Sequence, residues 1–338
     1  MAQAGVDAEP VNLIEACLVS DPGGELYLDL RSSLEPHLEA LLTRHKDAAA
    51  KADWSCHQFL PLDAFRAHAR RHRPLSRAAY TAVEMALLTE VNLPWYTAGL
   101  SHGLRGCPAP IQEFVRVWTS EEDQHATLLE AYLLLSGNGD PAARARARKA
   151  VITAGWTHQL GSPFEGMVYT AIQEAVTRTF YLCTARACEP DDPGLAEALR
   201  RIAKDETLHM AFYRDVVKVH LDLDAGYVQP LAAVMSRFQM PWSASFAGDF
   251  VERQAYVEAH GGFTLADYYR DVVQLLWSYW GIDRLAPRGE DARRALVQLR
   301  KYRAVLGKFA GRGDGLDARP ESEGAAGTKP PSRGTAAP

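Results

Sequence analysis

The sequence lacks the features of a membrane protein or a secreted protein. No stretch approaches the roughly 18 uninterrupted apolar residues that a membrane-spanning helix needs. Asp7 and Glu9 lie where a secretory signal peptide would be basic, so we expect no secretion. Basic residues are not in excess, since 37 Lys and Arg stand against 42 Asp and Glu, for a net charge of −5. That balance argues against extensive nucleic-acid binding.

Cysteine is also scarce, and its pattern does not suit a disulfide framework. The chain has five cysteines, an odd number, and no two of them form a Cys-x-x-Cys spacing. We therefore expect a soluble, cytoplasmic protein whose thiols stay reduced. The cysteines are Cys17, Cys56, Cys107, Cys183 and Cys188.

The 338 residues have a globular composition with helical patterning. Hydrophobic residues make up 47% and charged residues 23%, which excludes a disordered or fibrous chain. Apolar residues recur every three or four positions, and strand-like alternation is scarce, so we expect one helical domain over residues 1–310. Residues 311–338 are rich in Gly, Pro, Ala and Ser with few large apolar side chains, which predicts a disordered tail.

Capping chemistry marks the starts of several helices. Ser162, Pro163 and Glu165 form a capping box with proline at the first helical position. Asp140 and Asp192 each precede a proline in a similar acidic pattern. Long helices are predicted over 76–101, 110–136, 163–189 and 193–220, and shorter ones over 141–156, 230–240, 264–281 and 290–310. This arrangement predicts an all-α fold, a four-helix bundle with additional helices.

Two of the long helices carry a Glu-x-x-His pair. Glu122 precedes His125 by three residues, and Glu206 precedes His209 by three, so each pair projects from one helix face. The spacing alone is weak evidence, but each pair lies on an otherwise apolar stripe. Ionised groups that face a bundle core are costly unless they are paired or bind a metal. The alternative is a pair of ordinary Glu–His contacts on helix surfaces.

The other two long helices each offer a glutamate, and the spacing is regular. Glu122 follows Glu90 by 32 residues, and Glu206 follows Glu174 by the same 32. The chain thus has two helix hairpins, each with one Glu and then one Glu-x-x-His. Four carboxylates and two imidazoles inside a four-helix bundle form the ligand set of a di-iron carboxylate site. The predicted metal ligands are Glu90, Glu122, His125, Glu174, Glu206 and His209.

Around these residues the sequence resembles the soluble acyl-[acyl-carrier-protein] desaturases. The likeness runs from about residue 35 to 305, with the motifs in that family's order and near its spacing. The segments His209–Val216 and Phe238–Pro241 resemble the actinobacterial branch most closely. The motifs that carry the likeness are Thr89-Glu90-x-x-Leu93-Pro94, Trp118-Thr119-Ser120-Glu121-Glu122-x-x-His125, Leu135-Ser136-Gly137, Ser162-Pro163, Gln173-Glu174 and Asp205-Glu206-x-x-His209.

The resemblance implies a fold and an activity. It implies a ferritin-like bundle with two iron ions bound by the six predicted ligands, and dioxygen as co-substrate. It implies that the protein introduces a cis double bond into a fatty acyl chain on acyl carrier protein, with electrons from a ferredoxin-type donor. It also implies a homodimer. A related di-iron acyl hydroxylase or oxidase is the nearest alternative, and ferritin-like iron storage is a more distant one.

The same resemblance implies roles for residues next to the ligands. Asp205 is expected to orient His125, and by the pseudo-repeat Glu121 is expected to orient His209, since metal-bound imidazoles usually donate their second N–H to a carboxylate. Trp54 is expected to be the surface end of an electron route through Asp205 and His125. The alternatives are that these acids face solvent and that Trp54 only packs.

Two further residues are expected to shape the site. Thr177 matches a family threonine near the oxygen-binding side of the cluster, or it simply bonds back to the carbonyl of Gln173. Pro94 leaves the Glu90 carbonyl without its helical partner, so a local distortion is expected there. Leu93, Met167 and Phe180 are candidate channel walls, or ordinary core.

Some positions depart from the family pattern or suggest a docking surface. His102, Gly99 and Glu165 differ from the usual residues near the substrate channel, which leaves the substrate open. A basic run is either a solvated helix face or a docking patch for an acidic carrier protein. Its members are Arg44, Lys46, Lys51, Arg66, Arg70, Arg71, Arg73 and Arg77.

Overall fold

A computed structural model describes residues 32–67, 74–156, 161–241 and 249–313. Within these ranges the chain is helical and has no strand, so the predicted all-α class is confirmed. The N-terminal part comprises a 3-10 turn η1 (Ser32–Leu34) and helices α2 (Glu35–Lys51), α3 (Cys56–Phe59) and α4 (Leu62–Arg66). No helix within the described ranges combines the length and apolarity that crossing a membrane requires.

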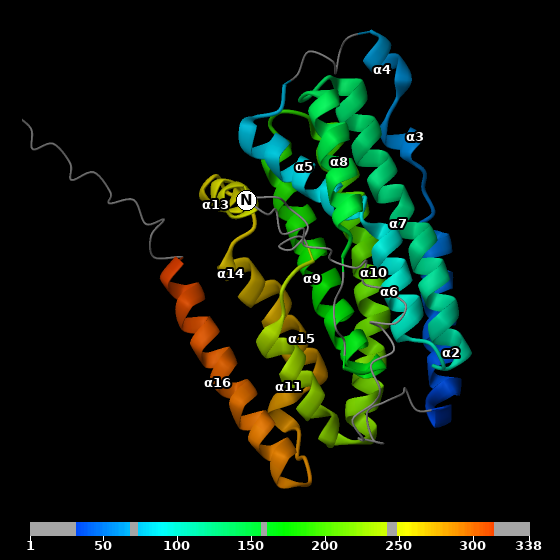
Figure 1. The fold of residues 1–338 in the computed structure, drawn as a ribbon, viewed down its shortest axis with the longest axis vertical. Helices are drawn as coiled ribbons and strands as arrows, with labels where there is room; N and C mark the ends of the chain where they lie inside the picture. The colour runs from blue at the N-terminus through cyan, green and yellow to red at the C-terminus, as the bar shows by residue number, and fades with distance from the viewer. Residues whose placement is uncertain (1–31, 68–73, 157–160, 242–248, 314–338) are drawn as a thin grey trace, which may run out of the picture.

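The centre of the molecule is a bundle of long helices (Figure 1). It contains α7 (Ala109–Ser136), α9 (Pro163–Cys188) and α10 (Pro193–Leu223), which match three of the predicted long helices within three residues at each end. The fourth member consists of α5 (Arg77–Glu90) followed by α6 (Leu93–Gly103). Helix α8 (Pro141–Ala154) connects the two hairpins. The four-helix bundle with additional helices is therefore confirmed.

The prediction of one continuous helix over 76–101 is wrong. Helix α5 ends at Glu90, and Val91 and Asn92 form a turn before α6 begins at Leu93. Pro94 has no N–H to donate to the Glu90 carbonyl, so the helical ladder stops there. The expected distortion beside the site thus takes the form of a full break, which leaves Glu90 as the last residue of α5.

Further helices cover the bundle on both sides. Helix α2 packs against α7 and α10, and α16 (Glu290–Gly313) lies on the opposite side against α11 (Val228–Arg237), as Figure 1 shows. The predicted helix 264–281 is divided into α14 (Leu265–Asp267), a π-helical turn η3 (Tyr268–Val273) and α15 (Gln274–Trp280). The remaining elements are η2 (Ala225–Tyr227), α13 (Phe250–Ala259) and η4 (Ile282–Arg284).

One connected hydrophobic core joins the bundle and its covering helices. On α2 the buried positions are Leu38, Leu42 and His45, which share one face at helical spacing. Helices α2, α3, α4 and α13 were not predicted from the sequence. Helix α16 continues three residues past the predicted boundary at 310, and the rest of the predicted tail lies outside the described residues.

Candidate metal centre

Six acidic and imidazole side chains from four helices meet in the middle of the bundle. They come from the end of α5, from one face of α7, from α9 and from one face of α10, and all six are buried. A carboxylate in an apolar interior is unfavourable without partners, so their convergence needs a reason. The six are the residues that the sequence spacing singled out: Glu90, Glu122, His125, Glu174, Glu206 and His209.

The six residues form two overlapping groups, each compact enough to hold one cation. Within each group, one ligand atom per residue lies within 4.8 Å of all the others. Two glutamates, Glu122 and Glu206, belong to both groups. The first group adds Glu90 and His125, and the second adds Glu174 and His209.

The two shared glutamates present one oxygen to each histidine. Oε2 of Glu122 lies 3.1 Å from Nδ1 of His125, and its Oε1 lies 2.9 Å from Nδ1 of His209. Oε1 of Glu206 lies 3.3 Å from Nδ1 of His125, and its Oε2 lies 3.9 Å from Nδ1 of His209. A carboxylate in this arrangement can bridge two cations, each of which would also contact one imidazole.

Several of the converging atoms make no hydrogen bond of good geometry within the described residues, although Oε1 of Glu122 and Nδ1 of His209 lie only 2.9 Å apart. These atoms are Oε1 of Glu122, Oε2 of Glu174, both carboxylate oxygens of Glu206 and Nδ1 of His209. A buried, unpaired polar atom costs about 1–3 kcal/mol, and an ionised one costs more. Cations between these atoms would remove that cost. Carboxylate oxygens and imidazole nitrogens suit iron and manganese, so the donor set fits a dinuclear centre.

Burial and the neighbouring carboxylates shift the pKa values of the converging groups. Burial, and then repulsion from Glu122 and Glu206, raises the pKa of Glu90 and of Glu174 well above the ordinary value. Burial opposes protonation of His125 and His209, but the surrounding carboxylates outweigh it and raise both pKa values. Cations bound between these groups would compete with protons for the same atoms.

The outer nitrogen of His125 faces a carboxylate that is itself held by two donors. Its Nε2 lies 3.4 Å from Oδ2 of Asp205, at the long end for a hydrogen bond. The same oxygen accepts the indole N–H of Trp54 at 2.6 Å, and Arg201 donates to the other oxygen. The structure thus brings Trp54, Asp205 and His125 together in the order expected. Trp54 is only 7% exposed, so its own ring offers little surface.

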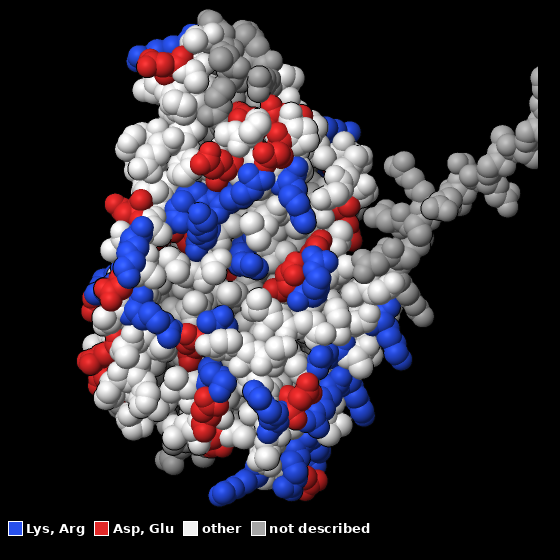
Figure 2. Space-filling view, turned by 180° about the vertical axis from the view of Figure 1, so that it is seen from behind, with Lys and Arg blue, Asp and Glu red and all other residues white. Residues whose placement is uncertain are grey.

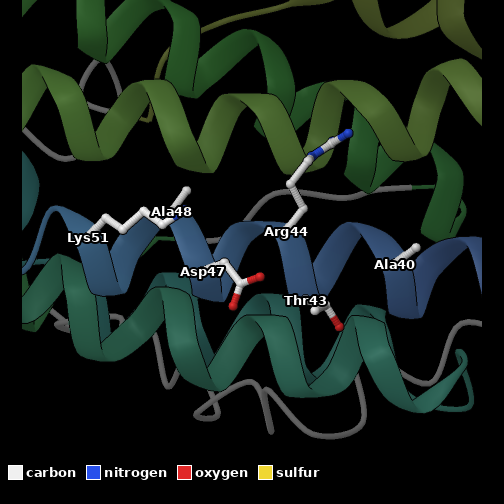
Figure 3. A pocket seen from close by; sticks show the side chains of 6 residues that line it. All are labelled: Ala40, Thr43, Arg44, Asp47, Ala48 and Lys51. Carbon is white, nitrogen blue, oxygen red and sulfur yellow. The ribbon is translucent and has the colours of Figure 1, made fainter.

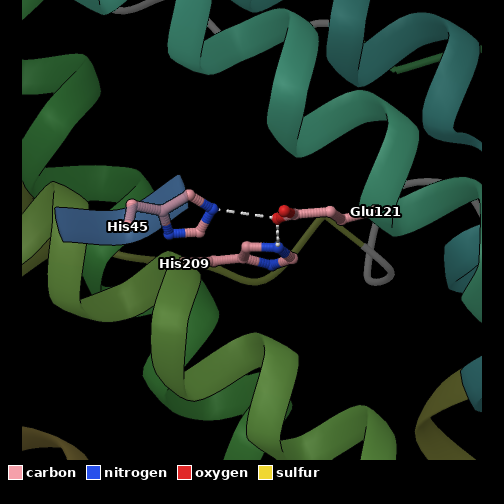
Figure 4. Close-up of side chains that lie close together, drawn as sticks. All are labelled: His45, Glu121 and His209. Carbon is pink, nitrogen blue, oxygen red and sulfur yellow. Dashed lines mark hydrogen bonds and ion pairs between the residues drawn. The ribbon is translucent and has the colours of Figure 1, made fainter. Parts of the chain in front are cut away.

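The outer nitrogen of His209 has an equivalent arrangement. Its Nε2 donates to Oε2 of Glu121 at 2.8 Å, and Nε2 of His45 lies 3.0 Å from the same oxygen (Figure 4). Burial raises the pKa of Glu121, but the hydrogen bonds from the two histidines outweigh it and hold that pKa at about 2. The contact of Glu121 with His209 was predicted, whereas His45 was not.

Each glutamate that belongs to only one group is held by an aromatic donor. The Tyr181 hydroxyl donates to Oε1 of Glu90, and the Trp118 indole N–H donates to Oε1 of Glu174 at 2.9 Å. Trp118 begins one of the motifs that carry the family likeness, whereas Tyr181 was not singled out from the sequence. The only available signal was its position seven residues after Glu174, on the same face of α9.

Thr177 makes the hydrogen bond to its own helix backbone that was expected if it has no special role. Its hydroxyl donates to the Gln173 carbonyl oxygen at 2.9 Å, one turn back on α9. An oxygen-side role for Thr177 stays a prediction. The candidate channel residues Leu93, Met167 and Phe180 are all buried.

Two of the positions that depart from the family pattern have defined surroundings. Oε2 of Glu165 accepts the N–H of Gly161 at 2.7 Å, so this carboxylate serves the start of α9. A methyl group added at Gly99 would lie 3.5 Å from the Trp156 ring, an ordinary packing distance. Glycine at 99 therefore leaves a small space beside that ring.

The basic run is partly neutralised by acidic neighbours. Arg44 donates to Asp215, and Lys46 donates to Glu113. On the face that Figure 2 shows, basic and acidic side chains are interspersed. The surface of α2 has a hollow of about 540 Å³, whose lining side chains Figure 3 draws. Arg70, Arg71 and Arg73 lie outside the described residues.

The sequence matches known desaturases over most of its length. Residues 27–322 match the family model described as fatty acid desaturase. The chain is 31% identical over 252 residues to a Mycobacterium tuberculosis protein assigned as the acyl-[acyl-carrier-protein] desaturase DesA1, which covers 70% of this chain and 72% of that protein. It is 27% identical over 288 residues to the chloroplastic stearoyl-[acyl-carrier-protein] 9-desaturase 5 of Arabidopsis thaliana, which covers 79% of this chain and 72% of that one.

A solved structure has the same fold. The X-ray structure of DesA2 from Mycobacterium tuberculosis H37Rv, assigned to the acyl-ACP desaturases, superposes with a TM-score of 0.57 at 23% identity. The match covers 78% of this chain and 97% of the other. The ferritin-like bundle is thereby confirmed as the fold, and the mycobacterial matches agree with the predicted actinobacterial resemblance.

Proposed function

The chain belongs to the fatty acid desaturase family, and from that premise we propose that it introduces a cis double bond into a fatty acyl chain carried on acyl carrier protein. Curated relatives from a bacterium and a plant carry names with this substrate class. The proposal includes two iron ions, dioxygen as co-substrate and a ferredoxin-type electron donor. It also includes a homodimer, on the family likeness.

The observation that carries the proposal is the set of six buried ligands with unpaired atoms. Glu90, Glu122, His125 and Glu206 would hold one iron ion, and Glu122, Glu174, Glu206 and His209 would hold the other. When bound, the iron pair would supply the oxidising chemistry, with dioxygen as the oxidant. The protein holds the ligands in place and keeps water away from them.

The residues around the ligands fix which nitrogen faces each cation. Asp205 accepts from Nε2 of His125, and Glu121 accepts from Nε2 of His209, so the protons stay on the outer nitrogens. The lone pair of Nδ1 in each ring is then directed at the cation. Tyr181 and Trp118 restrain the two unshared carboxylates in the same way.

External electrons would enter through the chain that begins at Trp54. Its indole donates to Asp205, and the guanidinium of Arg201, which donates to the other oxygen of Asp205, lies over the ring with its carbon 5.7 Å from the ring centre. The route then passes through Asp205 to His125, a ligand of the first site. A reduced donor would contact the residues that cover Trp54, because the indole itself is buried.

An apolar hollow against α9 is a candidate for part of the acyl chain. It has a volume of about 410 Å³, within the usual size of ligand pockets. Val176 of α9 lines it together with Phe238, Met240 and Phe263. Val176 lies two residues beyond Glu174 and so on a different face of α9 from that carboxylate. Thr177 follows Val176 on the same helix, and we propose that it acts on the oxygen-binding side of the metal pair.

We also propose a cytoplasmic location. The cysteines within the described residues, from Cys56 onward, form no disulfide with one another, and most of them are buried. Free thiols persist in reducing compartments, which supports a cytoplasmic location.

Mass spectrometry of the product tests the reaction. The iron-loaded protein is reduced anaerobically with acyl-loaded carrier protein and then exposed to air. Loss of two hydrogens from the acyl chain is the expected result. Gain of one oxygen atom would instead indicate an acyl hydroxylase, and an unchanged chain would contradict both.

A further inference from the structure

His45 is a buried polar residue on an otherwise apolar helix face. It shares the inner face of α2 with Leu38 and Leu42, and it is 5% exposed. Its ring meets the edge of Phe114, with centroids 4.9 Å apart, and it lies near Phe212. An apolar side chain would fill this position without needing a hydrogen bond. The imidazole must therefore have a partner, or its burial would cost free energy.

That partner is the carboxylate that orients a proposed metal ligand. Nε2 of His45 lies 3.0 Å from Oε2 of Glu121, and Nε2 of His209 lies 2.8 Å from the same oxygen. Figure 4 shows both rings directing a nitrogen at the same Glu121 oxygen. Each ring donates an N–H to one oxygen, so the carboxylate is held between α2 and α10. The Glu121 side chain is 20% exposed and could otherwise turn toward water.

In both halves of the site, the carboxylate that faces a histidine ligand also contacts a second N–H donor. Asp205, which faces His125, is held by an N–H donor from the N-terminal segment, the indole of Trp54. Glu121, which faces His209, is held by another such donor, His45. The donors come from neighbouring parts of the chain and reach opposite hairpins. Such outer hydrogen bonds fix ring orientation and commonly alter metal affinity.

We propose that His45 is a positioning residue, which holds the Glu121 carboxylate against His209 so that this ligand keeps its metal-facing orientation. The inference rests on the proposed metal centre. Without His45, Glu121 keeps a single histidine partner and gains freedom to swing outward. His209 then loses its fixed orientation, and the site formed with Glu174 weakens. The site formed with Glu90 and His125 keeps its own restraints.

Cobalt titration of the metal-free, full-length chain tests this role. Co²⁺ serves as the probe because its visible absorption reports each occupied site. His45→Phe keeps the aromatic packing and removes the N–H, while His45→Gln keeps an N–H donor near the same place. His37→Gln, on the exposed face of the same helix, is the matched control. Far-UV circular dichroism checks that each variant folds, and His45→Leu replaces the Phe variant if it does not.

The unaltered chain is expected to bind two Co²⁺ ions. The H45F variant should bind the first normally and the second about 10- to 100-fold more weakly. The H45Q and H37Q variants should bind both as the unaltered chain does. In an E121Q background, H45F should add no further loss, because the two residues act as one unit.

Two results overturn the role of His45. One is normal binding of both ions by H45F. The other is an equal loss from H45F with and without E121Q, which would mean that His45 does not act through Glu121. Failure of the unaltered chain to bind two ions is a different result, which would overturn the proposed metal centre and this inference with it.

Discussion

Metal loading of the metal-free protein should release protons, and their number can be worked out from the site. Glu90 and Glu174 have raised pKa values, and so do His125 and His209. The raised pKa values favour the protonated form of all four groups, so each can hold a proton that a bound cation would displace. Loading two cations should therefore release up to about four protons, or up to about two for each cation. Glu122 adds none, because its pKa is lowered and it is already ionised.

This count predicts a steep pH dependence of metal affinity. Each displaced proton changes the affinity about tenfold per pH unit, so two protons per cation give about 100-fold per unit. The affinity should fall as the pH falls, since protons then compete better for the ligands. Anaerobic calorimetric titration with Fe²⁺, in buffers of different ionisation enthalpy at one pH, counts the protons directly.

Two variants make the count specific. Glu174→Gln replaces a protonated acid with an amide that has no proton to lose, so it should release about one proton fewer. Asp123→Asn, at the exposed neighbour of Glu122, should leave the count unchanged. Release of less than one proton for two bound cations would refute the assignment of protons to these groups. So would an equal change in both variants.

Four further predictions concern the stability of the metal-free protein and the effects of three substitutions. The four raised pKa values mean that the folded state binds more protons than the unfolded one. Urea unfolding without metal should therefore become easier as the pH rises above the ordinary pKa values of about 4.5 for Glu and about 6.5 for His, whereas the loaded protein should resist this trend. Tyr181→Phe should weaken Fe²⁺ binding about tenfold, because Glu90 loses the hydrogen bond that holds it. Tyr169→Phe on the same helix should leave Fe²⁺ binding unchanged, and equal affinities of the two variants would show that Tyr181 does not restrain Glu90. Trp54→Phe should slow reduction of the iron-loaded protein without changing its iron content, as measured by stopped-flow absorption, and an unchanged rate would exclude this route. Leu38→Ala should lower the free energy of unfolding by about 2–5 kcal/mol in urea titrations, and a loss below about 1 kcal/mol would show that α2 is not tightly packed.

The buried cluster of six side chains could be predicted from the sequence because its pattern is local. A Glu-x-x-His pair on an apolar stripe places two costly groups on one buried face, and the equal spacing from Glu90 to Glu122 and from Glu174 to Glu206 adds the second hairpin. The contacts of Asp205 and Glu121 with the two histidines were expected from the family resemblance and the pseudo-repeat, and the structure brings each pair together. Helical periodicity and capping chemistry likewise predicted α7, α9 and α10 closely.

The residues that were missed depend on packing between distant segments. His45 lies 76 residues from Glu121 in the chain, and no periodicity links the two positions. Tyr181 contacts Glu90 across the bundle, 91 residues away. The break after Glu90 was expected as a distortion, but its extent depends on how Asn92 and the start of α6 pack. Helix α2 itself has a weakly apolar sequence, and its burial is set by the groove between α7 and α10.

Anomalous X-ray diffraction from crystals of the iron-loaded protein addresses the central assignment most directly. Data collected on either side of the iron absorption edge locate iron without reference to the protein ligands. Two iron positions should appear, both in contact with Glu122 and Glu206, one beside His125 and the other beside His209. A single iron position, or iron located away from these side chains, would contradict the dinuclear centre.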